Sequence, residues 1–439
     1  MIKRVIPAVI SLIIIMNISF GESINIELET AKSIALKQNP GVKLAREGVK
    51  KLDATVTEAR SGLFPSVSAF SSLQHAWELP TIVIDFPGVG RQAFKMGSEN
   101  TVASGINISQ PLFTGGAIWT GYRMSMLSRE IAHANLKSVE QNTVYQVTNA
   151  YYGVLFAKSA VAVAKQALES AEENLLQVTK FYNAGKSSRF DVLRAEVQMA
   201  NFKPMVVSST NQLKLAESGL RLVLGMENDK DFNYTEELRF DTSDLTEKNL
   251  DELIEIALQE RPEVIILNNQ KKMALRQLTL ARSSFMPSLL FGTNYQYQGL
   301  RDDFEFTKDD FYKSFNSTLS ISIPLFNGFK NSANIQKARI GITESNHQEE
   351  SLNNAIRVEV KTAFYKIKEA KENVLTQQKT IEQAEEALKL ANLMYSEGSS
   401  TQLDVLNANL ALNQAKMNYT KSLFEYNVAI ASLKKAISH

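Results

Sequence analysis

Few side chains of this 439-residue chain have the types and spacing that enzyme or metal chemistry requires. It contains no cysteine, which excludes disulfides, thiolate metal sites and cysteine nucleophiles. The four histidines are scattered, and none belongs to a His-Glu-x-x-His pair or a nucleophile triad: they are His75, His133, His347 and His439. With 48 Lys+Arg against 47 Asp+Glu, the chain lacks the basic excess that nucleic-acid phosphates attract. We therefore predict no enzyme, no cofactor, no metal centre and no nucleic-acid partner.

Two weaker motifs have simpler interpretations. Residues 88–93 imitate a dinucleotide-binding fingerprint, but Pro87 precedes them and no helix-opening pattern follows. The acidic residues Asp302, Asp303, Asp309 and Asp310 lack the spacing of a calcium loop. We interpret the first segment as a loop between paired strands and the second as a solvated loop.

Two matching turns carry the most informative chemistry. Long helical patterns stop at Gly185 and at Gly398, and glycine tolerates the left-handed conformation that ends many helices. A Ser/Thr-x-x-Asp pattern follows each, with the acid at Asp191 or Asp404. Such an acid caps the next helix and favours the positive end of its dipole. Helix capping explains why an aspartate stands at both positions. A functional role for the charge of these side chains is compatible with capping.

The elements that position these turns are duplicated. Residues 33–40 recur at 255–262, an offset of 222, and residues 110–115 recur at 323–328, an offset of 213. Asp191-Val192-Leu193 recurs as Asp404-Val405-Leu406, also at an offset of 213. The offset falls by nine only between Pro65 and Pro111, so the second copy has a shorter insert there. We predict two halves with one plan.

Each half reads as a helix, two strands, a long helix and a shorter helix. The first repeat, 22–247, has helix 27–61, strands 66–77 and 101–110, helices 117–183 and 189–225, and linker 226–247. The second repeat, 248–439, has helix 248–283, strands 288–298 and 313–323, and helices 330–397 and 402–438. The strands alternate apolar with small polar residues over about 10–11 positions, a length that spans a membrane when tilted.

Heptads run through both long helices. One column of the first is Thr143, Ala150, Ala157, Ala164, Ala171 and Val178, and the matching column of the second is also rich in alanine. A seven-residue repeat predicts coiled-coil packing, and small residues allow close approach of the backbones. At about 1.5 Å per residue each helix is a rod of roughly 100 Å.

The N-terminus has the pattern of a signal peptide over residues 1–21. Lys3 and Arg4 precede an apolar run from Val5 to Ile18, and small residues follow. The alternative, a membrane anchor, is too short for a roughly 30 Å hydrocarbon core. No other apolar run has the length of a membrane helix, so any membrane contact of the mature chain would use β-strands.

Four strands cannot close a barrel, and open edges are not tolerated in lipid. Two chains would give eight strands with a filled interior, whereas three would give twelve with room for a channel. A soluble sandwich joined to coiled coils is the alternative.

This plan resembles the outer-membrane efflux protein family. The resemblance rests on the strand-boundary prolines Pro65/Pro287 and Pro111/Pro324 and on the turns 182–193 and 395–406, and it covers nearly the whole mature chain. It implies a mostly α, mixed α+β membrane protein that forms a homotrimer. Twelve strands form its transmembrane β-barrel, continuous with a twelve-helix coiled-coil barrel in the periplasm of a Gram-negative-type bacterium. Because it has no cysteine that could be acylated at the mature N-terminus, the chain resembles the unlipidated branch of the family.

The resemblance also implies an outer-membrane exit duct of a tripartite efflux or type I secretion system. Its partners would be a periplasmic adaptor protein, an inner-membrane pump of RND, ABC or MFS type, and outer-membrane lipid. A stand-alone diffusion pore and a structural coiled-coil tether are alternatives. The sequence does not distinguish a drug, a metal or a protein as cargo.

The resemblance assigns roles to the two turns. It implies a periplasmic gate at Asp404, Asn407, Asp191 and Tyr395. Relatives can carry a second acid where this chain has Asn407, and some carry a basic latch where it has Ser400. Whether Lys186 or Arg189 replaces that latch stays open. The implied adaptor-contact residues are Gly185, Lys186, Ser188, Arg189, Gly398, Ser400 and Thr401.

Overall fold

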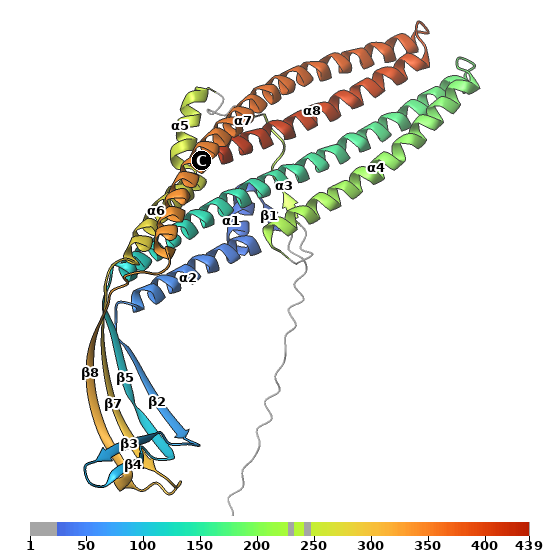
Figure 1. Cartoon of the computed structure of the whole chain (residues 1–439). Helices are drawn as coiled ribbons and strands as arrows, with labels where there is room; N and C mark the ends of the chain where they lie inside the picture. Colours follow the sequence, from blue (N-terminus) through green and yellow to red (C-terminus); the bar gives the residue numbers. More distant parts are fainter. Residues whose placement is uncertain (1–23, 227–231, 241–246, 439) are drawn as a thin grey trace, which may run out of the picture.

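The computed structural model describes residues 24–226, 232–240 and 247–438. The predicted signal peptide, residues 1–21, lies outside them. The chain forms a long, bent rod with a sheet at one end and two helical hairpins at the other (Figure 1). The predicted predominance of helix is confirmed.

The first half contains the following elements in chain order: β1 (Ile24–Ile26), α1 (Leu28–Gln38), α2 (Pro40–Ser61), β2 (Ser66–His75), β3 (Thr81–Phe86), β4 (Gly90–Lys95), β5 (Asn100–Thr114), α3 (Ala117–Asn183), α4 (Arg189–Leu224) and β6 (Phe232–Tyr234). The second half contains α5 (Leu250–Glu260), α6 (Pro262–Ser283), β7 (Ser288–Arg301), the short 3-10 helix η2 (Lys308–Asp310), β8 (Phe311–Ser322), α7 (Lys330–Ser396) and α8 (Gln402–Ala436).

The single helix predicted over 27–61 is wrong, because it breaks at Asn39 into α1 and α2. Pro40 cannot donate an amide to α1, and the Asn39 side chain instead accepts from the backbone N–H groups of Gly41 and Val42. The helix predicted over 248–283 breaks in the same way before Pro262, with Arg261 between α5 and α6.

The strands also differ from prediction at their ends. β5 begins one residue before the predicted strand 101–110 and continues to Thr114, with a register shift between Pro111 and Phe113. β7 extends to Arg301, beyond the predicted 288–298. The strand predicted over 66–77 ends at His75, and the one predicted over 313–323 begins at Phe311 and ends at Ser322.

The main sheet has four antiparallel strands in the order β2-β5-β7-β8. The two halves meet where β5 pairs with β7, so β2 and β8 are the edges. β3 and β4 form a separate hairpin, and β1 pairs in parallel with β6 from the predicted linker. Of the helices in these ranges, none combines the length and the apolar character needed to cross a membrane.

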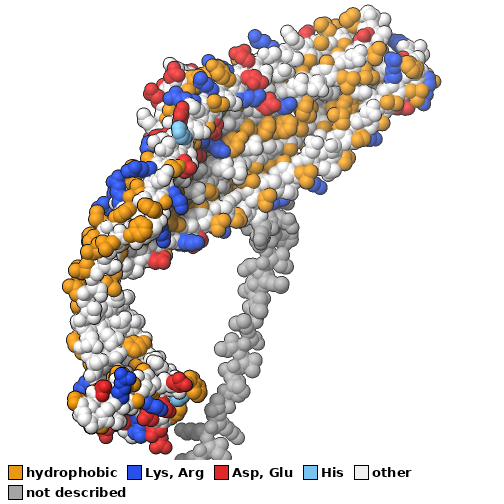
Figure 2. Space-filling view, viewed as in Figure 1, with side chains coloured by type: hydrophobic (Ala, Val, Ile, Leu, Met, Phe, Trp, Pro, Cys, Tyr) orange, Lys and Arg blue, Asp and Glu red, His pale blue; other side chains and the backbone are white. Residues whose placement is uncertain are grey.

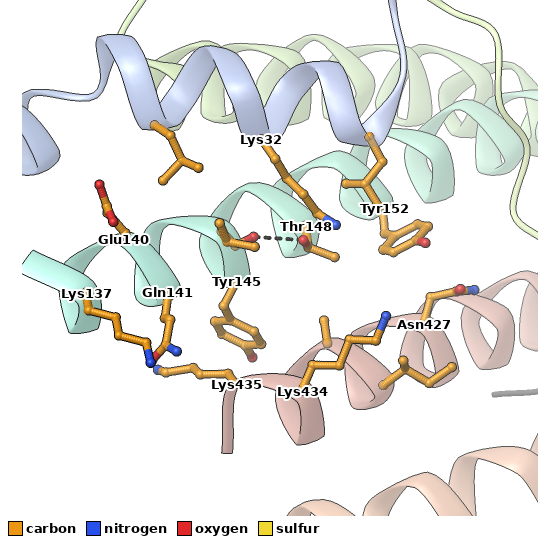
Figure 3. A pocket seen from close by; sticks show the side chains of 15 residues that line it. Lys32, Lys137, Glu140, Gln141, Tyr145, Thr148, Tyr152, Asn427, Lys434 and Lys435 are labelled. Carbon is orange, nitrogen blue, oxygen red and sulfur yellow. Dashed lines mark hydrogen bonds between the residues drawn. The ribbon is translucent and has the colours of Figure 1, made fainter. Parts of the chain in front are cut away.

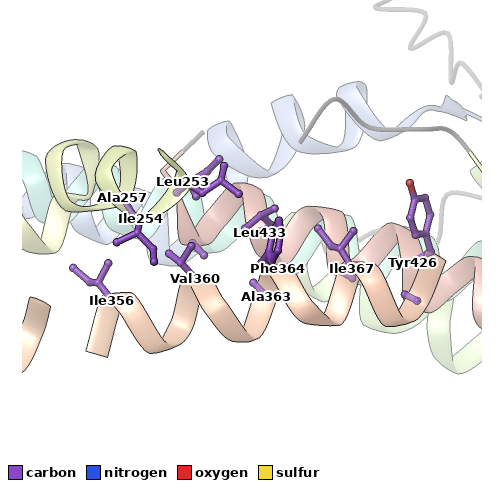
Figure 4. Close-up of a cluster of buried hydrophobic side chains, with 14 of the residues drawn as sticks. Leu253, Ile254, Ala257, Ile356, Val360, Ala363, Phe364, Ile367, Tyr426 and Leu433 are labelled. Carbon is purple, nitrogen blue, oxygen red and sulfur yellow. The ribbon is translucent and has the colours of Figure 1, made fainter. Parts of the chain in front are cut away.

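Apolar packing concentrates where the short helices cover the long ones. In the first half, α1 packs against α3 and α4 around Val147, Tyr151 and Leu220. In the second half, α5 packs against α7 and α8 around Leu253, Ile356, Val360, Ile367 and Leu433 (Figure 4). The alanine heptad column of α3 is buried at Ala157, Ala164 and Ala171. These clusters hold the short helices against the long ones.

Candidate functional site: the helical turns and the open edges

The turns at Gly185 and Gly398 lie at the ends of the hairpins farthest from the sheet (Figure 1). Both glycines have left-handed φ angles, 74° and 75°. In the first turn the Lys186 N–H donates to the Phe181 carbonyl and the Gly185 N–H to the Tyr182 carbonyl. Ser399 and Gly398 repeat this pattern in the second turn. These are Schellman helix ends, in which the left-handed residue satisfies the last carbonyls of the helix.

The predicted capping boxes are present after both glycines. The Ser188 hydroxyl donates to Asp191 Oδ2 over 2.7 Å, and the Ser188 amide donates to the same oxygen over 3.1 Å. The Thr401 hydroxyl and amide donate to Asp404 Oδ2 over 2.7 and 2.9 Å. Both carboxylates therefore hold the first turn of the next helix.

These bonds lower the pKa of both carboxyl groups. The hydrogen bond from the Ser188 hydroxyl lowers the pKa of Asp191 most, and the hydrogen bond from the Thr401 hydroxyl lowers the pKa of Asp404 most. Each donor stabilises the ionised form, so the acids stay charged below the usual range of an aspartate. Asp404 is exposed, as is Asn407 one turn later, whereas Asp191 is half-buried.

Tyr395 lies against the other hairpin, because its ring centroid is 5.6 Å from that of Phe181 on α3. The Tyr395 and Ser400 hydroxyl oxygens are buried without a hydrogen-bond partner among the described residues. The side-chain amide of Gln402 is also buried without a hydrogen-bond partner among the described residues, and the residue is 2% exposed. Sequence reasoning missed Phe181, which lies just outside the turn 182–193, and Gln402, which lies within the turn 395–406 but is not one of its glycine or capping positions.

The basic residues of the first turn do not reach Asp404. Arg189 Nη1 lies 3.7 Å from Glu196 Oε1 on its own helix, and the Arg194 guanidinium stacks over the Phe190 ring at 4.4 Å. Lys186 is exposed. Lys and Arg side chains gather at this end of the molecule in Figure 2.

The lateral edges of the molecule are unpaired. Within the described part of the chain, β2 pairs only with β5 and β8 pairs only with β7. The edge helices carry exposed apolar side chains, including Val207, Leu215 and Leu222 on α4 and Val358 and Tyr365 on α7, each at least 60% exposed. A single chain therefore leaves strand edges and apolar helix faces uncovered.

The two weaker motifs lie in a hairpin and in an ion-paired loop. Residues 90–93 belong to β4, so the predicted loop is wrong in part and is a hairpin with left-handed Gly88 and Gly90. In the acidic loop, Arg301 Nε lies 2.7 Å from Asp303 Oδ1 and its Nη1 lies 3.1 Å from Asp310 Oδ2. The Thr307 hydroxyl is the largest cause that lowers the pKa of Asp310 to about 2. Within the described ranges no group of three or more His, Cys, Asp and Glu side chains could hold a metal.

The fold of the chain is shared with outer-membrane channels of known structure. The chain matches the outer-membrane channel OprN with a TM-score of 0.77 and 19% identity, over 94% of this chain and 89% of that chain. It matches the CmeC outer membrane channel of Campylobacter jejuni with a TM-score of 0.78 and 17% identity, over 94% of this chain and 85% of that one.

The chain belongs to the outer membrane efflux protein family, whose sequence model matches residues 32–226 and 253–439. It is 22% identical to the outer membrane protein TolC of Vibrio cholerae over 87% of this chain and 84% of that protein. It is 21% identical to the alkaline protease secretion protein AprF of Pseudomonas aeruginosa, over 94% and 86%. It is 23% identical to the cobalt-zinc-cadmium resistance protein CzcC of Cupriavidus metallidurans, over 89% and 85%. The protein is thus an outer-membrane efflux channel of a transport family.

Proposed function

We propose that three copies of this chain form one passive exit duct. The observation that carries the proposal is the pair of unpaired lateral edges, β2 with α4 on one side and β8 with α7 on the other. Pairing β2 with β8 of the next copy would supply the missing strand hydrogen bonds. Packing α4 against α7 of the next copy would cover the exposed apolar side chains.

The trimer follows from the width that a channel needs. Two copies would give eight strands, whose interior side chains fill, whereas three copies would give twelve strands around an open lumen. In the same assembly the helices would form a twelve-helix periplasmic barrel continuous with the strands. The duct has no catalytic role, and its cargo moves because a partner supplies the energy.

The two turns form the end that meets the partners. We assign adaptor contact to Gly185, Lys186, Ser188, Arg189, Gly398, Ser400 and Thr401, because these rigid, exposed turns lie farthest from the sheet. The partners are a periplasmic adaptor and an inner-membrane pump of RND, ABC or MFS type. Relatives named for protease secretion and for metal resistance share this plan, so the partners decide the cargo.

The gate consists of Asp404, Asn407, Asp191 and Tyr395. Exposed Asp404 carboxylates from three copies would converge near the axis, where they repel one another and attract cations. The Tyr395 hydroxyl and the Gln402 amide are enclosed within the single chain without a hydrogen-bond partner among the described residues, so the packing at this end carries an energetic cost.

Planar-bilayer recording tests this function. A gated duct is expected to show a small conductance that increases when the turns are destabilised. A large, always-open conductance would favour a stand-alone diffusion pore, and no conductance at all would favour a structural tether. Native mass measurement of the same preparation should give three copies.

A further inference from the structure

A pocket of about 390 Å³ lies between α1, α3 and α8, away from the helical turns. Apolar walls come from all three helices, with Leu28 and Leu36 on α1, Val144 on α3 and Ile430 on α8. This volume and this lining are typical of sites that hold a small organic molecule. Because α1 and α3 belong to the first half and α8 to the second, the fold of the whole chain creates the pocket.

Four lysines from the three helices line this pocket with a single acid. Figure 3 shows Lys32 extending from α1 toward α8 and Lys434 extending from α8 toward α1. Lys137 of α3 and Lys435 of α8 line the same pocket, and Glu140 is its acid. Like charges that line one pocket repel one another and together attract an opposing charge, and Lys137 and Lys434 are exposed.

The acid does not supply that charge. Glu140 Oε1 lies 3.1 Å from the Arg46 guanidinium, outside the lysine group. Lys435 Nζ donates to the neutral Asn142 amide over 3.0 Å and lies 5.1 Å from the centre of the Tyr145 ring.

Lys32 is the exception, because its Nζ pairs with Glu29 over 2.7 Å. Within the part of the chain that the structure describes, Lys137, Lys434 and Lys435 have no ion pair. Three lysines therefore retain uncompensated charge beside an apolar wall.

The duplicated plan does not require two of these lysines. Lys32 of α1 corresponds to Ile254 of α5 at the offset of 222, and Lys137 of α3 corresponds to Glu350 of α7 at the offset of 213. Ile254 is buried in the core of its half. Lys32 and Lys137 are therefore particular to this pocket, whereas Lys434 corresponds to the basic Arg221 of α4 at the offset of 213.

We propose that this pocket binds a small anion with an apolar body, such as an aromatic carboxylate or phosphate ester. The apolar part would lie against Leu36 and Ile430, and the anionic group would accept hydrogen bonds from Lys137, Lys434 and Lys435. Lysine suits this task, since its ammonium is a flexible point charge with three donors. The site is separate from the proposed gate, because none of the residues that line the pocket belongs to the turns 182–193 and 395–406.

Calorimetric titration of the full-length protein in lipid nanodiscs tests the site. The probes are 1-naphthyl phosphate and 1-naphthoate, which distinguish a phosphate from a carboxylate ligand, with neutral 1-naphthol and inorganic phosphate as comparisons. We expect at least one naphthyl anion to bind at least tenfold more tightly than both comparison compounds. Its affinity should fall as salt rises.

Two variants separate charge from shape. Lys137→Gln with Lys434→Gln should weaken the binding of the naphthyl anion at least tenfold, and Ala431→Phe should block it by filling the pocket. Lys165→Gln, on α3 but outside the pocket, is the matched control and should bind as the wild type does. Thermal melting and native mass establish that each variant is intact, and the single variant Lys434→Gln is used if the double variant does not fold. Equal affinity for 1-naphthol, no binding by the wild type, or unchanged binding by the lysine variants would overturn the proposal.

Discussion

At the scale of single residues, the two capping aspartates have the same local bonds but different surroundings. Asp191 also accepts a hydrogen bond from the Ser187 hydroxyl, and the charge of Arg194 acts on it. Among the described residues, the side chain of the exposed Asp404 accepts hydrogen bonds only from Thr401. Asp404 therefore offers the more available negative charge, although both acids cap their helices.

This difference predicts how cations block the duct. A trivalent cation on the periplasmic side should reduce single-channel current in the wild type, and the block should weaken as the Debye length falls from about 10 Å at 0.1 M salt to about 3 Å at 1 M. Asp404→Ala should relieve most of the block, and Asn407→Asp should deepen it. Asp191→Ala should cost about 1 kcal/mol of capping and change the block less. Equal block in the wild type and in Asp404→Ala would place the constriction elsewhere.

The lowered pKa of Asp404 predicts a pH dependence of that block. A carboxyl group with a depressed folded-state pKa keeps its charge and its capping contribution above the ordinary value, and loses both as the pH falls through the lowered value. In the proposed trimer the Thr401 bonds favour the ionised form and repulsion among the three carboxylates opposes it, so the test compares the wild type with a variant that lacks the hydroxyl. Thr401→Val removes the hydroxyl that lowers the pKa of Asp404 most. The pH at which half of the cation block is lost should therefore be higher in this variant. An unchanged midpoint in current–pH curves would contradict this.

At the scale of elements, Gly398 fixes the end of α7 by its left-handed backbone. Apart from its two chain neighbours, no atom of the described residues lies within 4 Å of the position of a Cβ added at Gly398, so the φ angle of 75° is what limits a substitution. Gly398→Val should strain the turn by roughly 1 kcal/mol or more, and should reduce efflux and adaptor crosslinking while membrane insertion persists. Gly398→Asn is the control, because asparagine tolerates this conformation, and it should retain more of both activities. Normal transport and crosslinking in Gly398→Val would remove this turn from the adaptor contact.

The break between α1 and α2 depends on Asn39. Its Oδ1 caps α2, and its Nδ2 donates to the Val223 carbonyl of α4 over 2.8 Å. Asn39→Ala should lower the free energy of unfolding by about 1 kcal/mol for the cap, with a further loss for the second bond. The neighbouring Gln38→Ala, which removes an exposed side chain, should change it far less. Denaturant titration of both variants measures the difference, and equal stabilities would show that Pro40 alone sets the break.

At the scale of the whole molecule, assembly is predicted to cover the edges. Leu222 is 78% exposed and Leu215 is 71% exposed on α4, so Leu215→Glu with Leu222→Glu would place charges in the proposed contact with α7 of the next copy. The variant should lose the trimer in mild detergent. Leu176→Glu, at a 58% exposed position on the central helix α3, should retain it. A stable wild-type monomer in detergent, with its β-structure intact, would contradict the proposed assembly itself.

The sequence by itself determined the features that local chemistry encodes. The heptads specify α3 and α7, since a long apolar stripe at helical spacing has few other solutions. Gly185 and Gly398, with the acids Asp191 and Asp404, specify their turns because every partner in a helix end lies within a few residues. The duplication predicted a shared plan for the two halves.

The tertiary structure decided what depends on residues far apart in the chain. Sequence periodicity does not reveal that β1 pairs with β6, more than 200 residues away, or that Gln402 is buried. The hairpin of β3 and β4 was missed because its residues are exposed on both faces and lack a burial pattern. The lysine-lined pocket exists because α1, α3 and α8 pack together, and such long-range packing is set by the shape of whole helices, which no local motif records.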